Sequence, residues 1–308
     1  MEKIIEVNDL YKSYGSIKAV DGISFSVTKG DLFAFLGPNG AGKSTTIETI
    51  CTLLKPDSGT VKVAGFELGK KDDEIRKRIG IVFQYSVLDS LLTVKENLSL
   101  RAAFYGLSGQ KKSEAVEFAA YAAGVETFIN RPYGLLSGGQ RRRADIARAL
   151  VNTPEVIFLD EPTTGLDPQT RHHVWETINN LQQNNDMTVF LTTHYMEEAA
   201  NADQVAIIDE GKIVATGNPA ILKENYSTDR LMLVAKDAEI LRDLFDNKGI
   251  IYEQKGGQFI IKLRSTLHAL PLLDLVKNNI VSFQVITGDM DDVFVNITGK
   301  AMREDVCQ

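Results

Sequence analysis

Short apolar runs alternate with amphipathic stretches between residue 32 and about residue 208. The runs at 32–36, 79–84, 156–160 and 188–193 are mostly apolar and only a few residues long, which is typical of strands buried on both faces of a parallel sheet. The stretches between them have the length and pattern of covering helices. The pattern therefore predicts an α/β core, with helices packed on a mostly parallel sheet.

The segments around this core have different patterns. Apolar and polar residues roughly alternate at 4–7 and 23–27, which predicts a small antiparallel β layer that flanks the core. Strand-like runs then disappear between about 87 and 131, where Thr93 and Glu96 have the spacing of a helix capping box. These features predict an inserted helical subdomain, to which we assign residues from about 87 to 150.

The pattern changes again at about residue 226. The elements expected there are a strand at 231–235, a helix at 238–247, strands at 249–254 and 259–263, a helix at 267–277 and a strand at 281–286. This βαββαβ order is the split βαβ of a ferredoxin-like α+β domain, with Gly256 and Gly257 as the turn of its hairpin. An apolar stripe from Met290 to Ile297 predicts a helix with one packing face. We therefore expect two domains, residues 1–225 and 226–308.

Composition narrows the class of protein. A chain of 308 residues with 44% hydrophobic and 24% charged residues is an ordinary globular protein, long enough for two cores. The net charge of −7 argues against a large nucleic-acid-binding surface, so no nucleic acid is expected as a partner.

Cys51 and Cys307 imply no disulfide framework and fit a reducing cytoplasm. The N-terminus shows no secretory signal, and no apolar run approaches the roughly 18–20 residues of a membrane span, so any spanning part is expected on another chain.

A phosphate-binding motif follows the apolar run at 32–36. The segment matches G-x-x-x-x-G-K-[ST] and consists of Gly37, Pro38, Asn39, Gly40, Ala41, Gly42, Lys43 and Ser44. Glycines let the backbone curl so that its N–H groups, with the N-terminus of the next helix, point at phosphates. Lys43 then supplies a charge to the β- and γ-phosphates, Ser44 a hydroxyl to Mg²⁺, and Thr45 a further phosphate contact. The motif predicts binding of ATP and Mg²⁺.

Two acids end the apolar run at 156–160. Ligands of open α/β sheets lie at the carboxyl ends of the strands, so we expect Asp160 and Glu161 beside the phosphates. Asp160 is suited to holding Mg²⁺, and Glu161 to polarising the water that attacks the γ-phosphate. By itself an Asp-Glu pair would indicate only a solvated strand end. After a buried strand, in a chain that also has a phosphate-binding motif, it indicates a catalytic and metal-binding pair.

The segment Leu-Ser-Gly-Gly-Gln at 136–140 resembles the signature of the ATP-binding cassette (ABC) ATPases, and it precedes the acidic strand as in that family. Ser137, Gly138, Gly139 and Gln140 would open a helix, whose N-terminus attracts anions. One nucleotide needs only one phosphate loop. The second anion site therefore suggests that two copies pair head to tail, each covering the ATP of the other.

The resemblance implies roles for four more residues. Tyr14 resembles the aromatic residue that stacks on adenine, Gln84 the glutamine that touches Mg²⁺ or water, Asp167 the aspartate that communicates across the dimer, and His194 the histidine that contacts the γ-phosphate. Outside the family context, each has an ordinary alternative: a core or surface tyrosine, a polar strand end, a turn and a structural histidine. The basic cluster at 141–143 would be a solvated helix face with one or two arginines packed near the nucleotide interface.

The resemblance covers residues 2–225 densely and implies an ATPase that pairs with an identical copy and drives a separate permease from the cytoplasmic face of the membrane. The segment at 290–299 resembles, less specifically, the accessory domain of drug, antibiotic and polysaccharide exporters, which favours export. A rival is an ABC ATPase acting on ribosomes or DNA; such proteins carry tandem cassettes or a long coiled-coil insertion, and this sequence has neither. A third possibility is a regulatory module with little turnover, against which Glu161 and His194 argue.

Overall fold

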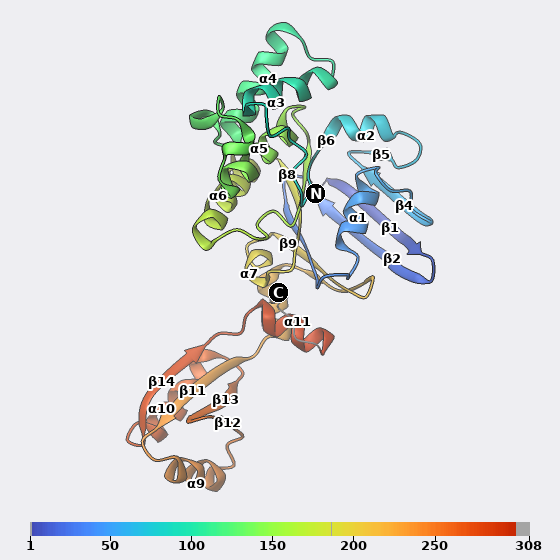
Figure 1. Ribbon diagram of the computed structural model, residues 1–308. Coiled ribbons are helices and arrows are strands. Elements are labelled where there is room, and N and C mark those ends of the chain that lie inside the picture. Colours follow the sequence, from blue (N-terminus) through green and yellow to red (C-terminus); the bar gives the residue numbers. More distant parts are fainter. Residues whose placement is uncertain (1, 186, 300–308) are drawn as a thin grey trace. The chain divides into compact units, whose positions relative to one another are not determined.

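The computed structural model describes residues 2–185 and 187–299 and divides into two compact units, one ending at Asn218 and the other starting at Pro219 (Figure 1). The division falls before the boundary expected at 225/226. The reason is helix α8 (Pro219–Tyr226), which packs on α11 (Met290–Thr298) of the second unit. Asn296 also donates a side-chain hydrogen bond to the carbonyl oxygen of Tyr226 at 2.6 Å.

A six-stranded sheet forms the centre of the first unit, with the order β10-β9-β3-β8-β7-β6. Its strands are β3 (Leu32–Leu36), β6 (Ile79–Val82), β7 (Val156–Asp160), β8 (Thr188–Thr193), β9 (Gln204–Asp209) and β10 (Lys212–Gly217). All neighbours are parallel except β9 and β10. In the register, Leu36 lies opposite Thr193 and Asp160 opposite Thr192. The carboxyl ends of β3, β8 and β7 therefore lie at one edge of the sheet.

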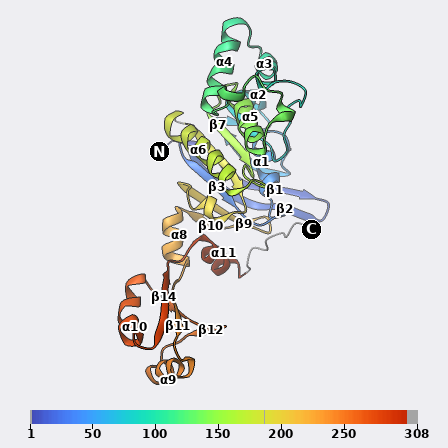
Figure 2. The same cartoon turned by 60° about the vertical axis from the view of Figure 1, so that its left-hand side comes forward.

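Helices cover both faces of this sheet (Figures 1 and 2). Helix α1 (Lys43–Ile50) contacts β7 on one side and strands of the flanking β layer on the other. On the opposite face lie α5 (Gly138–Leu150) and α6 (Pro168–Asn185), which contact β6 and β8. Phenylalanine rings from β3, β7 and β8, and Phe25 of the flanking layer, pack between the layers at centroid distances of 5.2–6.1 Å.

The flanking layer is an antiparallel sheet in the order β2-β1-β4-β5. Its strands are β1 (Lys3–Tyr14), β2 (Ile17–Thr28), β4 (Ser58–Val63) and β5 (Phe66–Glu67). The first two are much longer than the alternation at 4–7 and 23–27 indicates. Register shifts interrupt their pairing at several points, so the alternation of the sequence breaks although the strands continue.

The region after β6 is helical, as the sequence predicts. It contains α3 (Val94–Phe104), α4 (Gly109–Ala122), two 3₁₀ turns (Glu126–Phe128 and Tyr133–Leu135) and α5. Thr93 and Glu96 form the predicted capping box at the start of α3. The short helices α2 (Asp72–Arg78) and α7 (Met196–Ala199) complete the first unit.

The second unit contains the predicted βαββαβ order in an antiparallel sheet arranged β12-β13-β11-β14. Its elements are β11 (Asp229–Ala235), α9 (Ala238–Lys248), β12 (Glu253–Lys255), β13 (Gln258–Leu263), a 3₁₀ turn (Thr266–His268), α10 (Ala269–Val276) and β14 (Ile280–Ile286). The strand expected at 249–254 is wrong in its bounds. Gly249 ends α9 in the left-handed conformation, at a φ of 66°, and β12 begins only at Glu253.

No helix within the described ranges is both long enough and apolar enough to span a bilayer. Cys51 is buried with a free thiol, whereas Cys307 lies outside the described residues.

Candidate functional site

The phosphate loop joins β3 to α1 at the carboxyl edge of the sheet. Gly42 has a φ of 106°, and a Cβ atom there would collide with the carbonyl oxygen of Ala19, so the position excludes other residues for two reasons. Gly40 also lies in the left-handed region, at a φ of 80°. The loop thereby turns tightly into α1, and the first N–H groups of a helix have no partner within that helix. Such a turn can surround a phosphate with backbone donors.

Lys43 is buried, with only 4% of its side chain exposed. Its ammonium group donates to the carbonyl oxygens of Gly37 and Pro38 at 2.9 and 3.1 Å, and lies 3.2 Å from Oε1 of Glu161. Burial lowers the pKa of Lys43, against the opposing charges of Glu161 and Asp160. A buried cation held by loop carbonyls is positioned to receive an anion that enters the loop.

The side-chain oxygen atoms of Ser44 and Asp160 lie next to each other beside the phosphate loop. The Ser44 hydroxyl donates to Oδ1 of Asp160 at 3.4 Å, and the Thr192 hydroxyl donates to the same oxygen at 2.6 Å. Mg²⁺ prefers hard oxygen ligands and usually takes only one or two from the protein, the rest coming from water and phosphate. The pair therefore fits Mg²⁺ as part of a nucleotide complex.

Glu161 is the most constrained residue of the site. Its φ is 45°, which is uncommon for a residue with a side chain, and its backbone N–H donates to the Thr192 hydroxyl at 3.0 Å. Oε1 faces Lys43, and Oε2 accepts a hydrogen bond from the Thr164 hydroxyl at 3.1 Å. Burial by itself would raise the pKa of Glu161, but the neighbouring His194 ring and Lys43 ammonium outweigh it and lower the pKa to about 2. The carboxylate is therefore ionised and acts as a hydrogen-bond acceptor.

His194 follows β8 and completes this cluster. Its Nδ1 lies 3.3 Å from Oε1 of Glu161 but lacks the alignment of a hydrogen bond. The ring packs on that of Tyr195, at a centroid distance of 4.0 Å. The structure thus brings together Lys43, Ser44, Asp160, Glu161 and His194, which come from three separate parts of the sequence.

Ser137 starts α5 through a reciprocal capping box. Its hydroxyl accepts from the backbone N–H of Gln140 at 3.3 Å, while its own N–H donates to the Gln140 side chain at 3.1 Å. Gly138 and Gly139 form the first helical turn, where Gly139 lies against Thr170 so closely that a Cβ atom would collide with it. The segment is a well-formed helix N-terminus, the feature on which the second anion site was predicted.

The other predicted site residues are more exposed. Tyr14 ends β1 with 49% of its surface accessible, as a residue that stacks on a ligand requires. Gln84 does not end β6 as expected: the strand stops at Val82, and Gln84 is exposed in the following loop. Asp167 is also exposed and accepts a hydrogen bond from the N–H of Thr170 at the start of α6. Hydrogen bonds from the side chain and the backbone N–H of Thr170 lower the pKa of Asp167.

Arg142 has a structural role, in line with the expectation that one or two arginines of the cluster at 141–143 pack near the nucleotide interface, although the sequence did not single out this residue. It is 7% exposed and donates to the carbonyl oxygens of Pro162, Phe83 and Asp160 at 2.7, 2.5 and 2.9 Å. One guanidinium group therefore ties the residues just beyond β6 to the end of β7. A triple basic cluster normally indicates a solvated face, and no local signal separates Arg142 from its neighbours.

Two buried acids were also missed. Glu198 of α7 is 2% exposed and accepts hydrogen bonds from the hydroxyls of Thr163 and Thr193, so it links the residues after β7 to the end of β8. Asp145 of α5 accepts from the Ser86 hydroxyl at 2.6 Å, which fixes the loop that contains Gln84. Burial raises the pKa of Asp145 despite this bond. In the sequence, the hydroxyl residues at the end of the run at 188–193 were the feature that could have indicated a buried acceptor such as Glu198.

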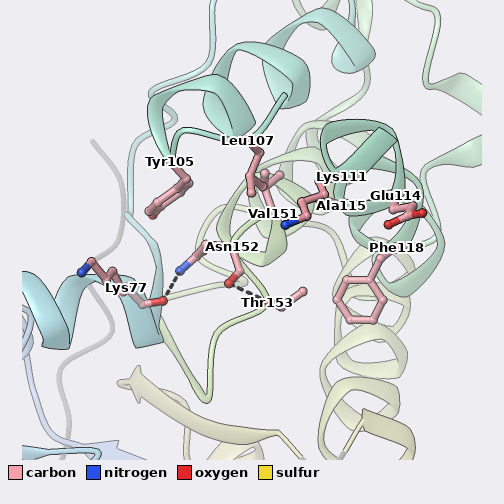
Figure 3. Close-up of a pocket in the computed structure, with 10 residues that line it drawn as sticks. All are labelled: Lys77, Tyr105, Leu107, Lys111, Glu114, Ala115, Phe118, Val151, Asn152 and Thr153. Atoms are coloured by element: carbon pink, nitrogen blue, oxygen red, sulfur yellow. Dashed lines mark hydrogen bonds between the residues drawn. The ribbon is translucent and has the colours of Figure 1, made fainter. Parts of the chain in front are cut away.

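A hollow of about 490 Å³ lies elsewhere in the first unit, between α2, α4 and the α5–β7 loop (Figure 3). Tyr105, Lys111 and Phe118 line it, and the Asn152 side chain at its wall donates to the carbonyl oxygen of Lys77 at 3.1 Å. None of the predicted site residues lines this hollow. A phosphate loop is a shallow cradle of backbone groups, so its ligand site need not form a deep cavity.

Known proteins share both the sequence and the fold. Residues 20–164 match the family model described as ABC transporter. The chain is 37% identical to the daunorubicin/doxorubicin resistance ATP-binding protein DrrA of Streptomyces peucetius, over 96% of this chain and 93% of the relative. It is 36% identical to the Nod factor export ATP-binding protein I of Ralstonia nicotianae, over 98% and 95% of the two chains.

Among solved structures, the chain resembles the dimeric ATP-binding cassette MJ0796 in a post-hydrolysis state with bound ADP and Pi. The TM-score is 0.62 at 30% sequence identity, over 70% of this chain and 98% of that one. The two relatives thus match nearly the whole chain in sequence. The solved cassette matches 70% of it in structure.

Proposed function

Because the chain belongs to the ABC transporter family and is an ATP-binding ATPase of that family, we propose that it is the motor subunit of an exporter. In this role it hydrolyses ATP as a homodimer on the cytoplasmic face of the membrane and drives a separate permease. The observation that carries the proposal is the convergence of Lys43, Glu161 and His194 at the ends of β3, β7 and β8.

We assign one role to each residue of the site. Lys43 binds the β- and γ-phosphates together with the N–H groups of the loop, and Tyr14 stacks on adenine. The ionised carboxylate of Glu161 orients the attacking water and takes its proton, while His194 holds the γ-phosphate. Ser44, Asp160 and Gln84 would hold Mg²⁺, and the ion would supply positive charge to the phosphates.

Head-to-tail pairing follows from the second helix N-terminus. Ser137 to Gln140 of one copy would cover the γ-phosphate bound by Gly37 to Ser44 of the other, with Asp167 at the boundary between copies. The dimeric state of the related cassette MJ0796 supports pairing of this kind. Each active site would then be composite, with residues from two chains.

A mixing experiment tests the composite site. Lys43→Ala disables the phosphate loop, and Ser137→Arg blocks the second anion site, so each homodimer is expected to lose nearly all ATPase activity. In a mixed dimer, one site carries both substitutions and the other carries none. An equimolar mixture of the two inactive variants should therefore recover about a quarter of the wild-type rate, because half of the dimers are mixed and have one intact site each.

The ATPase rate of the mixture is measured against protein concentration, with thermal melts confirming that Ser137→Arg, which costs a helix cap, remains folded. Absence of recovery from two folded, inactive variants would exclude the head-to-tail arrangement. Full activity of Ser137→Arg alone would show that this segment does not contact nucleotide.

The export role rests on the relatives, whose names include antibiotic resistance and Nod factor export. We expect the permease to be a membrane protein with about six long apolar segments, encoded beside this chain. Cells that express both chains should accumulate less of an anthracycline such as daunorubicin than cells whose chain carries Glu161→Gln, as measured by its fluorescence. Equal accumulation would reject this drug class as substrate, and equal accumulation across a panel of amphipathic compounds would argue against export.

A further inference from the structure

Strand β14 forms an exposed edge of the second unit's sheet. In the part of the chain that the structure describes, β14 pairs with β11 on one side and has no strand on the other. Val281 is 68% exposed and Phe283 56%. Phe283 lies opposite Leu233, a core residue on the face that α9 and α10 cover, so its ring belongs to the apolar face but extends beyond the helices. An apolar edge with unpaired backbone groups is a site for pairing with another strand.

The sequence of β14 indicates which strand would pair with it. Read from either end, the strand has the same order of side-chain types about its central residue. The order is Ile280, Val281, Ser282, Phe283, Gln284, Val285 and Ile286. Two copies in antiparallel orientation would place Phe283 opposite Phe283, Val281 opposite Val285, and Ser282 opposite Gln284. Every apolar residue then meets an apolar residue, and every polar residue meets a polar one.

The two edges of the sheet differ in charge. Strand β14 contains no charged residue, although natural edge strands are commonly protected by charges or proline. The opposite edge, β12, consists of Glu253, Gln254 and Lys255, all exposed. Pairing through β14 would therefore join two sheets into one of eight strands with charged edges at both ends. Such an assembly closes at two copies and does not extend into a fibre.

The ladder between β14 and β11 is regular from Ser282 to Ile286 and shifts only before Ser282. The centre of the strand is thus free of bulges in its pairing with β11, as a template for a further strand requires. We propose that β14 is a homodimerisation strand, which pairs with β14 of a second copy about a two-fold axis through Phe283. This contact is separate from nucleotide-dependent pairing of the first units and requires no ATP.

The position of Phe283 on the axis gives a specific test. With Phe283→Lys, two ammonium groups lie directly opposite each other, and with Phe283→Glu, two carboxylates do. Each variant should weaken the dimer by about tenfold or more in nucleotide-free full-length protein, because a paired phenylalanine is lost and like charges are opposed. An equimolar mixture of the two variants places lysine opposite glutamate and should form mixed dimers more readily than either variant alone.

Sedimentation equilibrium over a range of protein concentrations measures these dimers, with apyrase present to remove nucleotide. Ile251→Lys is the matched control, because Ile251 is 90% exposed but lies outside β14, and it should leave the dimer unchanged. A wild-type chain that stays monomeric at all concentrations, a Phe283→Lys dimer as strong as wild type, or variants that do not recover on mixing would each overturn the proposal. Open-ended aggregates in place of dimers would do so as well.

Discussion

Replacing Glu161 with Gln is expected to slow ATP turnover by about 10²- to 10⁴-fold while ATP binding is retained. The amide keeps the size of the side chain and can still accept a hydrogen bond from Thr164, but it cannot take a proton from water. Loss of the negative charge also removes the ion pair with Lys43, which leaves the lysine available to phosphate. The variant should therefore accumulate in the ATP-bound state as a dimer.

Single-turnover hydrolysis and size-exclusion chromatography with light scattering, both at saturating Mg·ATP, measure these two effects. Glu176→Gln is the matched control, since Glu176 is an exposed acid of α6 whose neighbours are His172 and His173. The control should hydrolyse ATP at the wild-type rate. A Glu161→Gln protein that is monomeric at saturating ATP would contradict the nucleotide sandwich, and one that retains turnover would remove Glu161 from the chemistry.

Replacing Lys43 with Ala is expected to weaken ATP binding by about 100-fold or more, because the variant loses a buried charge that faces the phosphates. The same change affects Glu161, whose pKa falls from its ordinary value of 4.5 to about 2 partly through Lys43. A lowered pKa contributes stability above pH 4.5, and this contribution disappears as the pH falls through about 2. The contribution of the ion pair to stability should therefore be absent from the variant near neutral pH.

Isothermal titration with ATP measures the first effect, and denaturant unfolding as a function of pH measures the second. Lys29→Ala provides a control, because Lys29 is 45% exposed and forms a surface ion pair with Glu2. Unchanged ATP affinity in Lys43→Ala would show that nucleotide binds elsewhere. A stability difference from wild type that is as large at pH 2 as at pH 7 would show that the ion pair with Glu161 is not its source.

Strands buried on both faces were predicted most accurately from the sequence. The bounds of β3, β7 and β8 match the runs at 32–36, 156–160 and 188–193 because such a strand has an uninterrupted apolar centre. Strand β6 ends earlier than its apolar run, since Phe83 leaves the ladder and its carbonyl oxygen accepts a hydrogen bond from Arg142. Pattern alone could not show this contact, which joins residues far apart in the sequence.

The predicted site depended on motif spacing, which indicates backbone geometry directly. The structure places the phosphate loop, Asp160, Glu161 and His194 together. It also contains supporting residues that no motif marks. Thr192 bonds both Asp160 and the N–H of Glu161, and Glu198 bonds threonines from two segments. Their roles arise from tertiary contacts between strand ends, which a single sequence does not encode locally.

The strand order at the site has a consequence for synthesis on the ribosome. Strand β8 lies between β3 and β7 in the sheet, although it is the last of the three to be translated. A nascent chain that ends before residue 188 carries both the phosphate loop and the two acids, but the strand that separates and aligns them is missing. The nucleotide site is therefore completed only after β8 and His194 have been translated, and its formation marks a chain in which β3, β8 and β7 have paired.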